Sequence, residues 1–238
     1  MDEQTTVAHR VLEFNEELAE KVLELPPEFK VINPFSGPRK GHVREVTTAF
    51  YRKYYDDHKP RRLVMGSSPA RRGTALTGVP FEDAEFLESQ TGINIEGYAI
   101  GPSSSGFLHE VMMRYGGRDR FYGDFIMSFV CPLGLVRTNP KGNEVNCNYY
   151  ENKALLECLH SFIVDTLKRQ LAFGADTSVG YCIGSGENFR FLSTVNKDQH
   201  FFQEIVPLEH PRFITQYNSK RKDEFIEKYM TALRGRDD

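Results

Sequence analysis

Four short apolar runs, each closed by a turn and separated from the next by a helical pattern, constrain this chain most. The runs and the residues after them are 62–66 before Ser-Ser-Pro, 124–131 before Pro-Leu-Gly, 179–183 before Gly-Ser-Gly and 202–208 before Glu-His-Pro. Continuous apolar runs of this length are typical of strands buried on both faces of a sheet. Strands that alternate with helices favour parallel pairing with crossover connections. The sequence therefore predicts an α/β fold with a mainly parallel, four-stranded sheet.

The segments between these runs carry apolar residues at helical spacing. We expect helices over 5–25, 45–56, 107–115, 153–173, a short stretch after residue 186, and 223–233. The paired prolines at 26 and 27 end the first of them, because proline cannot continue a helix.

Length and composition are those of one soluble globular domain. The 238 residues are 39% hydrophobic and 26% charged, and a mean hydropathy of −0.48 fits this class and excludes wholesale disorder. We expect a single, monomeric domain over 1–238, in which 1–60 form a helical and basic lead-in and 61–238 the α/β core. The longest near-apolar stretch, 125–136, has 12 residues, whereas a membrane helix needs about 20. Neither a membrane partner nor a signal peptide is expected.

The four cysteines, at positions 131, 147, 158 and 182, form no C-x-x-C pair and no zinc spacing with histidine. Scattered cysteines in a chain of this length are typical of reduced thiols inside a cell. We therefore expect a cytoplasmic protein with no disulfide, no metal ion and no cofactor.

The formal net charge of −3 hides an uneven distribution. Residues 1–30 hold eight acids and three bases, net −5, whereas residues 38–72 hold ten bases and three acids, net +7. The ten bases are Arg39, Lys40, Arg44, Arg52, Lys53, Lys59, Arg61, Arg62, Arg71 and Arg72. Such a local excess indicates either a solvated face or a surface that binds the DNA backbone.

In open parallel sheets, ligands bind beyond the carboxyl ends of the strands. The chemistry is therefore expected in segments 66–81, 128–148, 184–188 and 209–217. The Gly-Ser-Gly turn at 184–186 lacks the third glycine of a dinucleotide fingerprint, since residue 189 is phenylalanine, and is better read as a tight turn. The two serines at 67 and 68 lack the G-x-S-x-G frame of a serine hydrolase.

The segment from Met65 to Phe81, MGSSPARRGTALTGVPF, carries the most specific signal. It resembles motif 1 of the uracil-DNA glycosylase superfamily, closest to the single-strand-selective monofunctional branch. That branch has G-x-N-P, a spacer, and G-x-A-x-T-G-V-P-F, and the correspondence runs without a gap from Gly66 to Phe81. Similar segments are Asn33-Pro34, the Cys-Pro-Leu of 131–133 and the Leu-Glu-His-Pro of 208–211, so the resemblance covers nearly the whole chain.

The resemblance implies a three-layer α/β/α sandwich that cleaves the N-glycosidic bond of a deaminated base flipped out of DNA. It implies no metal and no covalent intermediate, and DNA as the partner in base excision repair. His210 takes the role of the hydrogen-bond donor to the departing base. Phe81 takes the position of the ring that stacks on the base, and Gly66 and Ser67 belong with the base-binding residues.

The resemblance also implies DNA-binding residues. Pro211, Arg212 and Phe213, with Ile214 to Tyr217, occupy the place of the loop that wedges into the minor groove. Arg71 and Arg72, within motif 1, are expected to contact phosphates.

Two positions depart from the pattern. Ser68 stands where the branch has an asparagine that positions the attacking water, and a hydroxyl has fewer donors and less reach. Phe129 stands where the family has an asparagine that reads uracil, and Ser128 would face the other side of a regular strand. Candidate replacements are Asn139, Asn146 and Asn148, of which Asn148 is counted in the predicted base-binding set.

Three functions follow. The first is a monofunctional DNA glycosylase for uracil, and for xanthine as well, since an apolar wall at Phe129 discriminates poorly. The second is a DNA-binding or damage-sensing protein with the same fold and a weakened reaction. The third, hydrolysis of a free nucleoside or nucleotide, is disfavoured by the basic segment.

Overall fold

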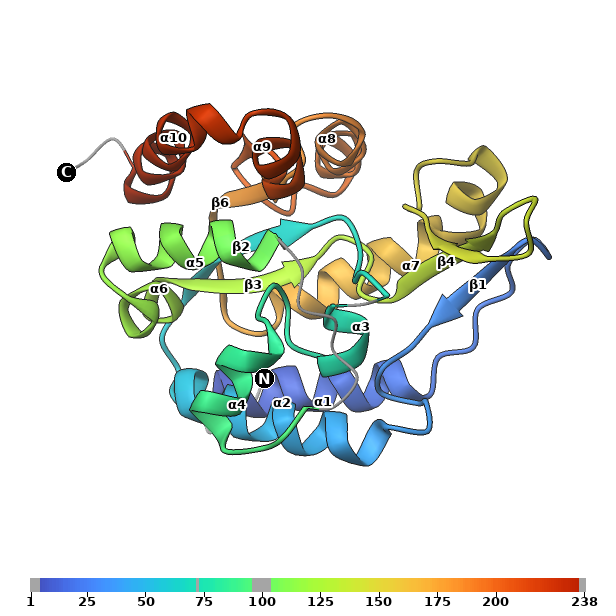
Figure 1. Ribbon diagram of the computed structural model, residues 1–238, viewed down its shortest axis with the longest axis horizontal. Helices are drawn as coiled ribbons and strands as arrows, with labels where there is room; N and C mark the ends of the chain where they lie inside the picture. Colours follow the sequence, from blue (N-terminus) through green and yellow to red (C-terminus); the bar gives the residue numbers. More distant parts are fainter. Residues whose placement is uncertain (1–4, 72, 96–103, 236–238) are drawn as a thin grey trace.

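A parallel four-stranded sheet forms the centre of the molecule (Figure 1). The computed structural model describes residues 5–71, 73–95 and 104–235. The strands are β2 (Arg61–Gly66), β3 (Phe125–Phe129), β6 (Ala175–Ile183) and β7 (Glu204–Leu208). They lie in the order β3-β2-β6-β7, and every pairing is parallel. The four predicted runs are the four strands, so the predicted sheet is confirmed.

Helices cover both faces of this sheet (Figure 1). On one side lie α1 (Val7–Ala19), α2 (Lys40–Tyr55) and α7 (Lys153–Leu171). On the other lie α5 (Ser104–Tyr115), α8 (Glu187–Gln199), α9 (Pro211–Tyr217) and α10 (Lys222–Arg234), with the 3-10 helix η1 (Ser219–Arg221) before α10. Shorter helices fill the connections: α3 (Thr74–Thr77), α4 (Ala84–Thr91) and α6 (Arg118–Asp124). The predicted three-layer sandwich is confirmed.

A second sheet was not predicted. It is antiparallel, in the order β1-β4-β5, with β1 (Phe29–Ile32), β4 (Gly134–Thr138) and β5 (Glu144–Asn146). These strands are only three to five residues long, and β1 pairs with a strand that follows about a hundred residues later, Phe29 opposite Arg137. Strands this short give no periodic pattern, and a pairing this distant leaves no local signal.

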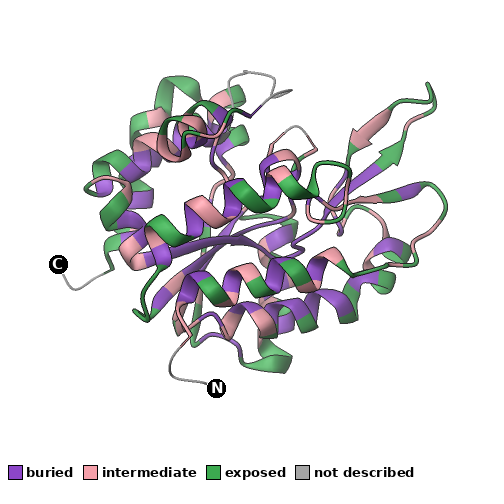
Figure 2. Ribbon diagram, turned by 90° about the horizontal axis from the view of Figure 1, so that it is seen from below, coloured by how far each residue is buried: buried purple, intermediate pink, exposed green. Residues whose placement is uncertain are grey.

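The amino-terminal helices pack directly on the α/β core (Figure 2). Val7 of α1, Val46 of α2 and Leu63 of β2 are each fully buried in one hydrophobic cluster. Helix α1 ends at Ala19, earlier than the predicted 25, and Val22 beyond it is 91% exposed. Within the described ranges, no helix has the length and apolar character needed to cross a membrane.

Candidate active site

The end of β2 and the end of β3 are held together beyond the sheet itself. The backbone N–H of Val130 donates to the carbonyl of Gly66 at 2.8 Å, and that of Cys131 donates to the carbonyl of Ser67 at 2.9 Å. Two turns whose bonded residues are 64 apart in sequence (66 and 130, 67 and 131) therefore form one rigid rim. Motif 1 and the Cys-Pro-Leu segment meet there, at the carboxyl edge of the sheet.

Gly66 leaves room for two aromatic rings. The rings of Phe81 and Phe129 stack with centroids 5.0 Å apart and planes 25° apart. A Cβ atom at residue 66 would lie 2.5 Å from Cζ of Phe81 and 3.1 Å from the Phe129 ring. Because a Cβ atom cannot lie 2.5 Å from another carbon, any larger residue at this position would displace the Phe81 ring from the stack. The structure thus brings together three residues of the predicted base-binding set.

The backbone of Phe81 is held in a conformation that phenylalanine avoids, with φ of 62°. Its N–H donates to Oγ1 of Thr74 at 3.3 Å. The next residue, Glu82, is 3% exposed and accepts two hydrogen bonds from Arg118, each of 3.0 Å. Tyr122 also donates its hydroxyl to Glu82. Two anchors on either side of its backbone therefore hold the Phe81 ring in place.

Two opposing effects act on the pKa of the Glu82 carboxyl. Burial raises the pKa of its carboxyl above the ordinary value, and the hydrogen bonds and charge of Arg118 oppose that rise. No local sequence pattern indicates this anchor, because Arg118 and Tyr122 lie on α6, more than 35 residues from Glu82 along the chain. A buried carboxylate with a guanidinium partner gives no local sequence signal.

Asn148 is the asparagine that the fold brings to motif 1. Its Oδ1 accepts a hydrogen bond from the Ser67 hydroxyl at 2.8 Å. Its backbone N and its Nδ2 both donate to Oε1 of Glu151, at 3.0 and 2.9 Å. The amide is therefore fixed in orientation by Ser67 and Glu151. Sequence analysis did not identify Glu151.

The other two candidate asparagines serve the β4–β5 hairpin. Asn139 accepts hydrogen bonds from the backbone N–H groups of Lys141 and Asn143 at the hairpin turn. Asn146 accepts one from the backbone N–H of Arg71 at 3.0 Å, which ties the hairpin to motif 1. Neither side chain therefore has the contact with Ser67 that Asn148 makes.

Ser128 faces away from this rim, as the alternation along a strand predicts. Its hydroxyl is hydrogen-bonded to Gln170 of α7, and Gln170 in turn donates to the carbonyl of Phe129 at 3.1 Å. Ser128 is thus part of the packing between β3 and α7.

His210 is the N-cap residue of α9. Its Nδ1 accepts the backbone N–H of Arg212 at 3.1 Å. The neutral ring must then carry its proton on Nε2, which leaves an N–H available as a donor. Burial lowers the pKa of His210, and the nearby Arg212 charge lowers it further, so the neutral form is favoured.

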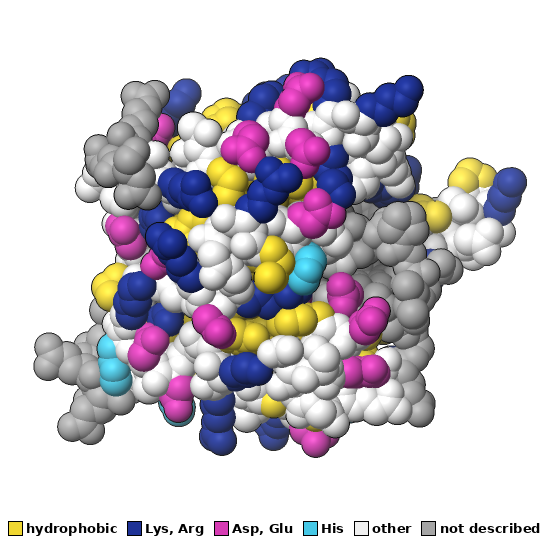
Figure 3. All heavy atoms as spheres, turned by 60° about the vertical axis from the view of Figure 1, so that its left-hand side comes forward, with side chains coloured by type: hydrophobic (Ala, Val, Ile, Leu, Met, Phe, Trp, Pro, Cys, Tyr) yellow, Lys and Arg dark blue, Asp and Glu magenta, His cyan; other side chains and the backbone are white. Residues whose placement is uncertain are grey.

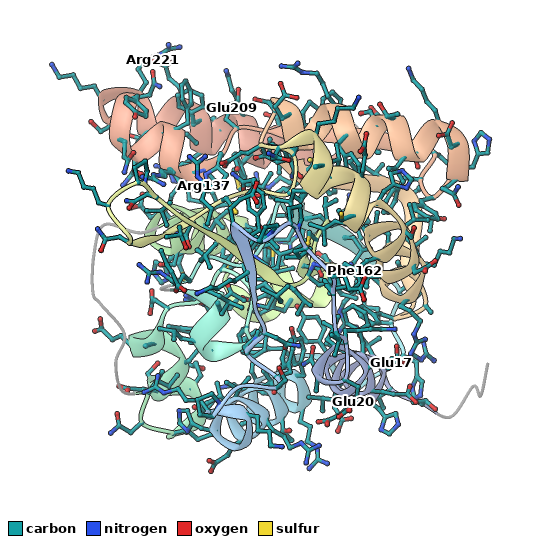
Figure 4. The ribbon with its side chains drawn as sticks, turned by 90° about the vertical axis from the view of Figure 1, so that its right-hand side faces the viewer. Glu17, Glu20, Arg137, Phe162, Glu209 and Arg221 are labelled. Carbon is teal, nitrogen blue, oxygen red and sulfur yellow. The ribbon has the colours of Figure 1, made fainter. Side chains whose placement is uncertain are left out.

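Helix α10 fixes the backbone of Glu209, the residue before His210. The hydroxyl of Tyr229, which is 1% exposed, donates to the carbonyl of Glu209 at 2.5 Å. In Figure 4, Glu209 and Arg221 lie at the level of the upper helices, and Arg137 of β4 lies below them. Tyr229 lies within the helix predicted over 223–233, and no local sequence pattern indicates its contact with Glu209.

The remaining predicted residues lie around the same rim. Ser68 is half-buried, and its hydroxyl makes no hydrogen bond with any other residue in the described part of the chain. Pro211 is buried at the start of α9, whereas Arg212 and Phe213 are exposed. Arg71 is half-buried beside the hairpin, and Arg72 lies outside the described residues.

Several of the described bases in segment 38–72 are paired with acids. Lys59 pairs with Asp124, and Arg44 pairs with Glu16. Arg61, at the amino end of β2, is buried and pairs with Asp57. Figure 3, which brings the left-hand side of Figure 1 forward, shows Lys and Arg interspersed with Asp and Glu on that face. Ion pairs therefore neutralise part of the sequence excess of +7.

This chain is similar to known proteins over most of its length. The family model of the uracil DNA glycosylase superfamily matches residues 52–234. The crystal structure of wild-type SMUG2 from Pedobacter heparinus superposes with a TM-score of 0.90 and 38% sequence identity, covering 97% of this chain and 98% of that one. A search of curated proteins gives no match.

These findings define the class of protein as a DNA glycosylase, a hydrolase of N-glycosyl bonds. The chain belongs to the uracil-DNA glycosylase superfamily. The resemblance stated from motif 1, to this superfamily and its single-strand-selective monofunctional branch, is confirmed. Enzymes of this superfamily act on DNA.

Proposed function

We propose that this enzyme removes both uracil and xanthine from DNA, each base being flipped out of the strand before water cleaves its N-glycosidic bond. The observation that carries the broad base range is the stack of Phe129 on Phe81, at a centroid distance of 5.0 Å. By the family resemblance, this apolar ring stands where the family has an asparagine that reads uracil.

The departing base takes the bonding electron pair when its bond to C1′ breaks, so negative charge develops on the base. The Nε2–H of neutral His210 donates a hydrogen bond to that charge. The donor is pre-oriented, because Nδ1 is already committed to the Arg212 backbone at 3.1 Å. Such preorganised donors contribute about 2.7–4 kcal/mol to a transition state.

Water attacks C1′ of the sugar as the base departs, and its proton passes to solvent. Ser68 lies at the end of β2 with its hydroxyl uncommitted within the described structure, so it is able to accept a hydrogen bond from this water. No lysine lies within motif 1 or segment 208–213, so attack by an amine and Schiff-base lyase chemistry are not proposed.

The flipped base stacks on Phe81, and its polar edge is read by Asn148. Asn148 already uses Oδ1 toward Ser67 and Nδ2 toward Glu151. Each of these atoms keeps capacity for one more hydrogen bond, since an amide oxygen accepts two and an amide nitrogen donates two. Asn148 thus offers one donor and one acceptor in a fixed orientation.

Xanthine suits such a site better than it suits a strict uracil reader. A site that reads a base with buried polar groups rejects the wrong base strongly, whereas an apolar wall discriminates poorly between similar shapes. Xanthine has the same two carbonyls and imide on its six-membered ring as uracil, and it ionises easily. It therefore needs less stabilisation as a leaving group.

The test is a panel of single-turnover rates on matched oligonucleotides that contain uracil, xanthine or hypoxanthine, read by strand cleavage in alkali. We expect cleavage at uracil and at xanthine. Phe129→Asn should raise the uracil-to-xanthine rate ratio, whereas Phe129→Leu, which stays apolar, should leave it near the wild-type value. Absence of xanthine cleavage, or an unchanged ratio in Phe129→Asn, would refute the proposal.

The same assay tests the alternative functions. Binding of the uracil oligonucleotide without cleavage would support a damage-sensing protein, which Ser68 and Phe129 motivate. Turnover of free deoxyuridine would support a nucleoside hydrolase instead.

A further inference from the structure

Tyr149 and Tyr150 are adjacent in the loop between β5 and α7, and the fold uses their hydroxyl groups differently. The two rings pack edge to face, with centroids 4.9 Å apart and planes 79° apart. Tyr149 is fully buried, and its hydroxyl donates to Oδ1 of Asn188 at 2.6 Å. Tyr150 is half-buried. Edge-to-face packing needs only the ring, so packing does not explain the hydroxyl of Tyr150.

Tyr149 is attached to the end of β6. Its partner Asn188 donates from Nδ2 to the carbonyl of Ile183, the last residue of that strand, at 2.9 Å. The next residue, Gly184, donates its backbone N–H to the carbonyl of Leu208 at 2.8 Å. The loop that carries the two tyrosines is therefore joined, through this turn, to the end of β7.

Tyr150 is attached to the end of β2. Asn148, two residues earlier, accepts the Ser67 hydroxyl at 2.8 Å. Burial raises the pKa of Tyr150, and a hydrogen bond with the Ser67 hydroxyl opposes that rise. β6 lies between β2 and β7 in the sheet. The two tyrosines therefore lie between Ser67 and the strand that leads to His210.

Hydrogen bonds run in one direction from Tyr150 through Ser67 to Asn148. Nδ2 of Asn148 donates to the carboxylate of Glu151 at 2.9 Å, which fixes the amide with Oδ1 toward Ser67. A serine hydroxyl has a single proton, and that of Ser67 goes to Asn148. Ser67 therefore accepts from Tyr150, so the phenol uses its proton on the protein and keeps a lone pair for a ligand.

Tyr150 and Asn148 together match the imide edge of a base. The phenol oxygen offers an acceptor, and the second hydrogen on Nδ2 of Asn148 offers a donor. Uracil and xanthine both carry an N–H beside a carbonyl on this edge. Cytosine instead carries a bare ring nitrogen beside an amino group. Its ring nitrogen would face the phenol oxygen, acceptor against acceptor, and its amino group would face a donor.

We propose that Tyr150 reads the flipped base, its phenol oxygen accepting the imide N–H while Nδ2 of Asn148 donates to the adjacent carbonyl. The pair supplies, from the loop after β5, the donor and acceptor that Phe129 cannot supply from β3. The proposal rests on the function proposed above and deepens it, because it names the group that admits uracil and xanthine and rejects cytosine. One such hydrogen bond contributes about two- to twelvefold in affinity.

The experiment measures the binding of two otherwise identical oligonucleotides that carry 2′-fluoro-2′-deoxyuridine or 2′-fluoro-2′-deoxycytidine at one position. Fluorine disfavours the positive charge that develops on the sugar during cleavage, so both strands stay intact and fluorescence anisotropy gives equilibrium affinities. The wild type should bind the uracil strand more tightly than the cytosine strand. Tyr150→Phe keeps the ring, and it should lower that affinity ratio by about two- to twelvefold.

Tyr149→Phe is the matched control. It removes the neighbouring hydroxyl, which is bonded to Asn188, so it should lower the free energy of unfolding and leave the uracil-to-cytosine ratio unchanged. Equal losses on both strands in Tyr150→Phe would overturn the proposal in favour of a structural role. Unchanged affinities in Tyr150→Phe, or a wild type without preference between the strands, would also overturn it.

The binding ratio does not depend on cleavage, so the two proposals fail separately. A wild type that prefers the uracil strand but cleaves neither uracil nor xanthine refutes the proposed function, while Tyr150→Phe still decides the reader. A wild type that cleaves both bases, together with an unchanged ratio in Tyr150→Phe, refutes the reader alone.

Discussion

The two ends of strand β2 carry similar polar residues and use them in opposite ways. At the amino end, Arg61 is 2% exposed and donates to both carboxylate oxygens of Asp57, at 2.6 and 2.7 Å, and to the carbonyl of Tyr122 at 2.6 Å. At the carboxyl end, the Ser68 hydroxyl makes no hydrogen bond within the described structure, and Arg71 has no ion-pair partner there.

The difference follows from where each end points. The amino end packs against α2 and α6, where an unsatisfied guanidinium would cost several kcal/mol, so every donor is paired internally. In the proposed function the carboxyl end faces DNA, and groups already satisfied by the protein would have nothing left to offer it. Uncommitted polar groups at one end of β2 and fully paired ones at the other therefore agree with the proposed site.

The largest effect at the carboxyl end is expected from His210→Ala. Loss of the Nε2–H donor should lower the single-turnover rate on uracil by about 10²–10³-fold, the usual effect of removing one preorganised donor. The free energy of unfolding should fall by about 0.5–2 kcal/mol, because the N-cap hydrogen bond from the Arg212 N–H to Nδ1 is lost. A rate within threefold of wild type would contradict the role of His210.

At the amino end, Arg61→Ala should act on stability. Removing one partner from a buried ion pair costs about 3–5 kcal/mol, and we expect about 3 kcal/mol because Asp57 is itself half exposed. Urea unfolding measures this loss. Below the unfolding transition the cleavage rate should stay near wild type, and a selective rate loss in a fully folded variant would break the contrast between the two ends.

Gly66→Ala should damage activity through Phe81. The added Cβ would lie 2.5 Å from Cζ of Phe81, so the stacked ring must move. Displacements of about 1 Å in a catalytic site cost on the order of 10²-fold in rate. Gly41→Ala is the control, since an added Cβ there meets nothing within 4 Å. Equal rates for both variants would show that Phe81 does not need this space.

Arg71→Ala should change the salt dependence of DNA binding. The slope of log affinity against log salt is negative. If Arg71 contacts one phosphate, its removal should make that slope less negative by about 0.9. Arg52→Ala, on α2 near the amino edge, should leave the slope unchanged. Measurement of affinity between 50 and 200 mM salt distinguishes them, at about these concentrations. An unchanged slope for Arg71→Ala would place this arginine away from DNA.

The smallest effect is expected from Arg212→Ala on the protonation of His210. Burial lowers the pKa of His210 first, and the Arg212 charge second. Removing the charge should raise the pKa, while burial keeps it below its usual value. Titration of the His210 ring by NMR measures this, and Arg212→Lys, which keeps the charge, should shift it less.

The sign for stability follows from the same pKa. Because the folded-state pKa of His210 is lowered, the stability it contributes is present above the unfolded value of 6.5 and is lost as pH falls through the folded value. Arg212→Ala should make that loss smaller, because it brings the folded pKa closer to the unfolded value. A pKa equal to that of the wild type would show that Arg212 does not influence the ring.

Local sequence features determined the central sheet and the core of the site. Buried parallel strands produce continuous apolar runs, so the four strands could be found within a few residues. Motif 1 is contiguous, so Gly66, Ser67 and Phe81 could be assigned together. His210 precedes a proline that begins α9, and this places the histidine at a helix N-terminus.

Only the tertiary structure determined which asparagine reaches motif 1, how Phe81 is anchored and how the second sheet pairs. Each of these features depends on residues far apart in the sequence. The fold selected Asn148 from three asparagines by bringing it to Ser67, 81 residues away. It anchored Phe81 through Glu82 and Arg118, and it paired β1 with β4 across about a hundred residues. Within the basic segment, the fold buried Arg61 and left Arg71 half-buried beside the β4–β5 hairpin. Burial and long-range contacts set these outcomes, and neither is encoded by a residue type at a local spacing.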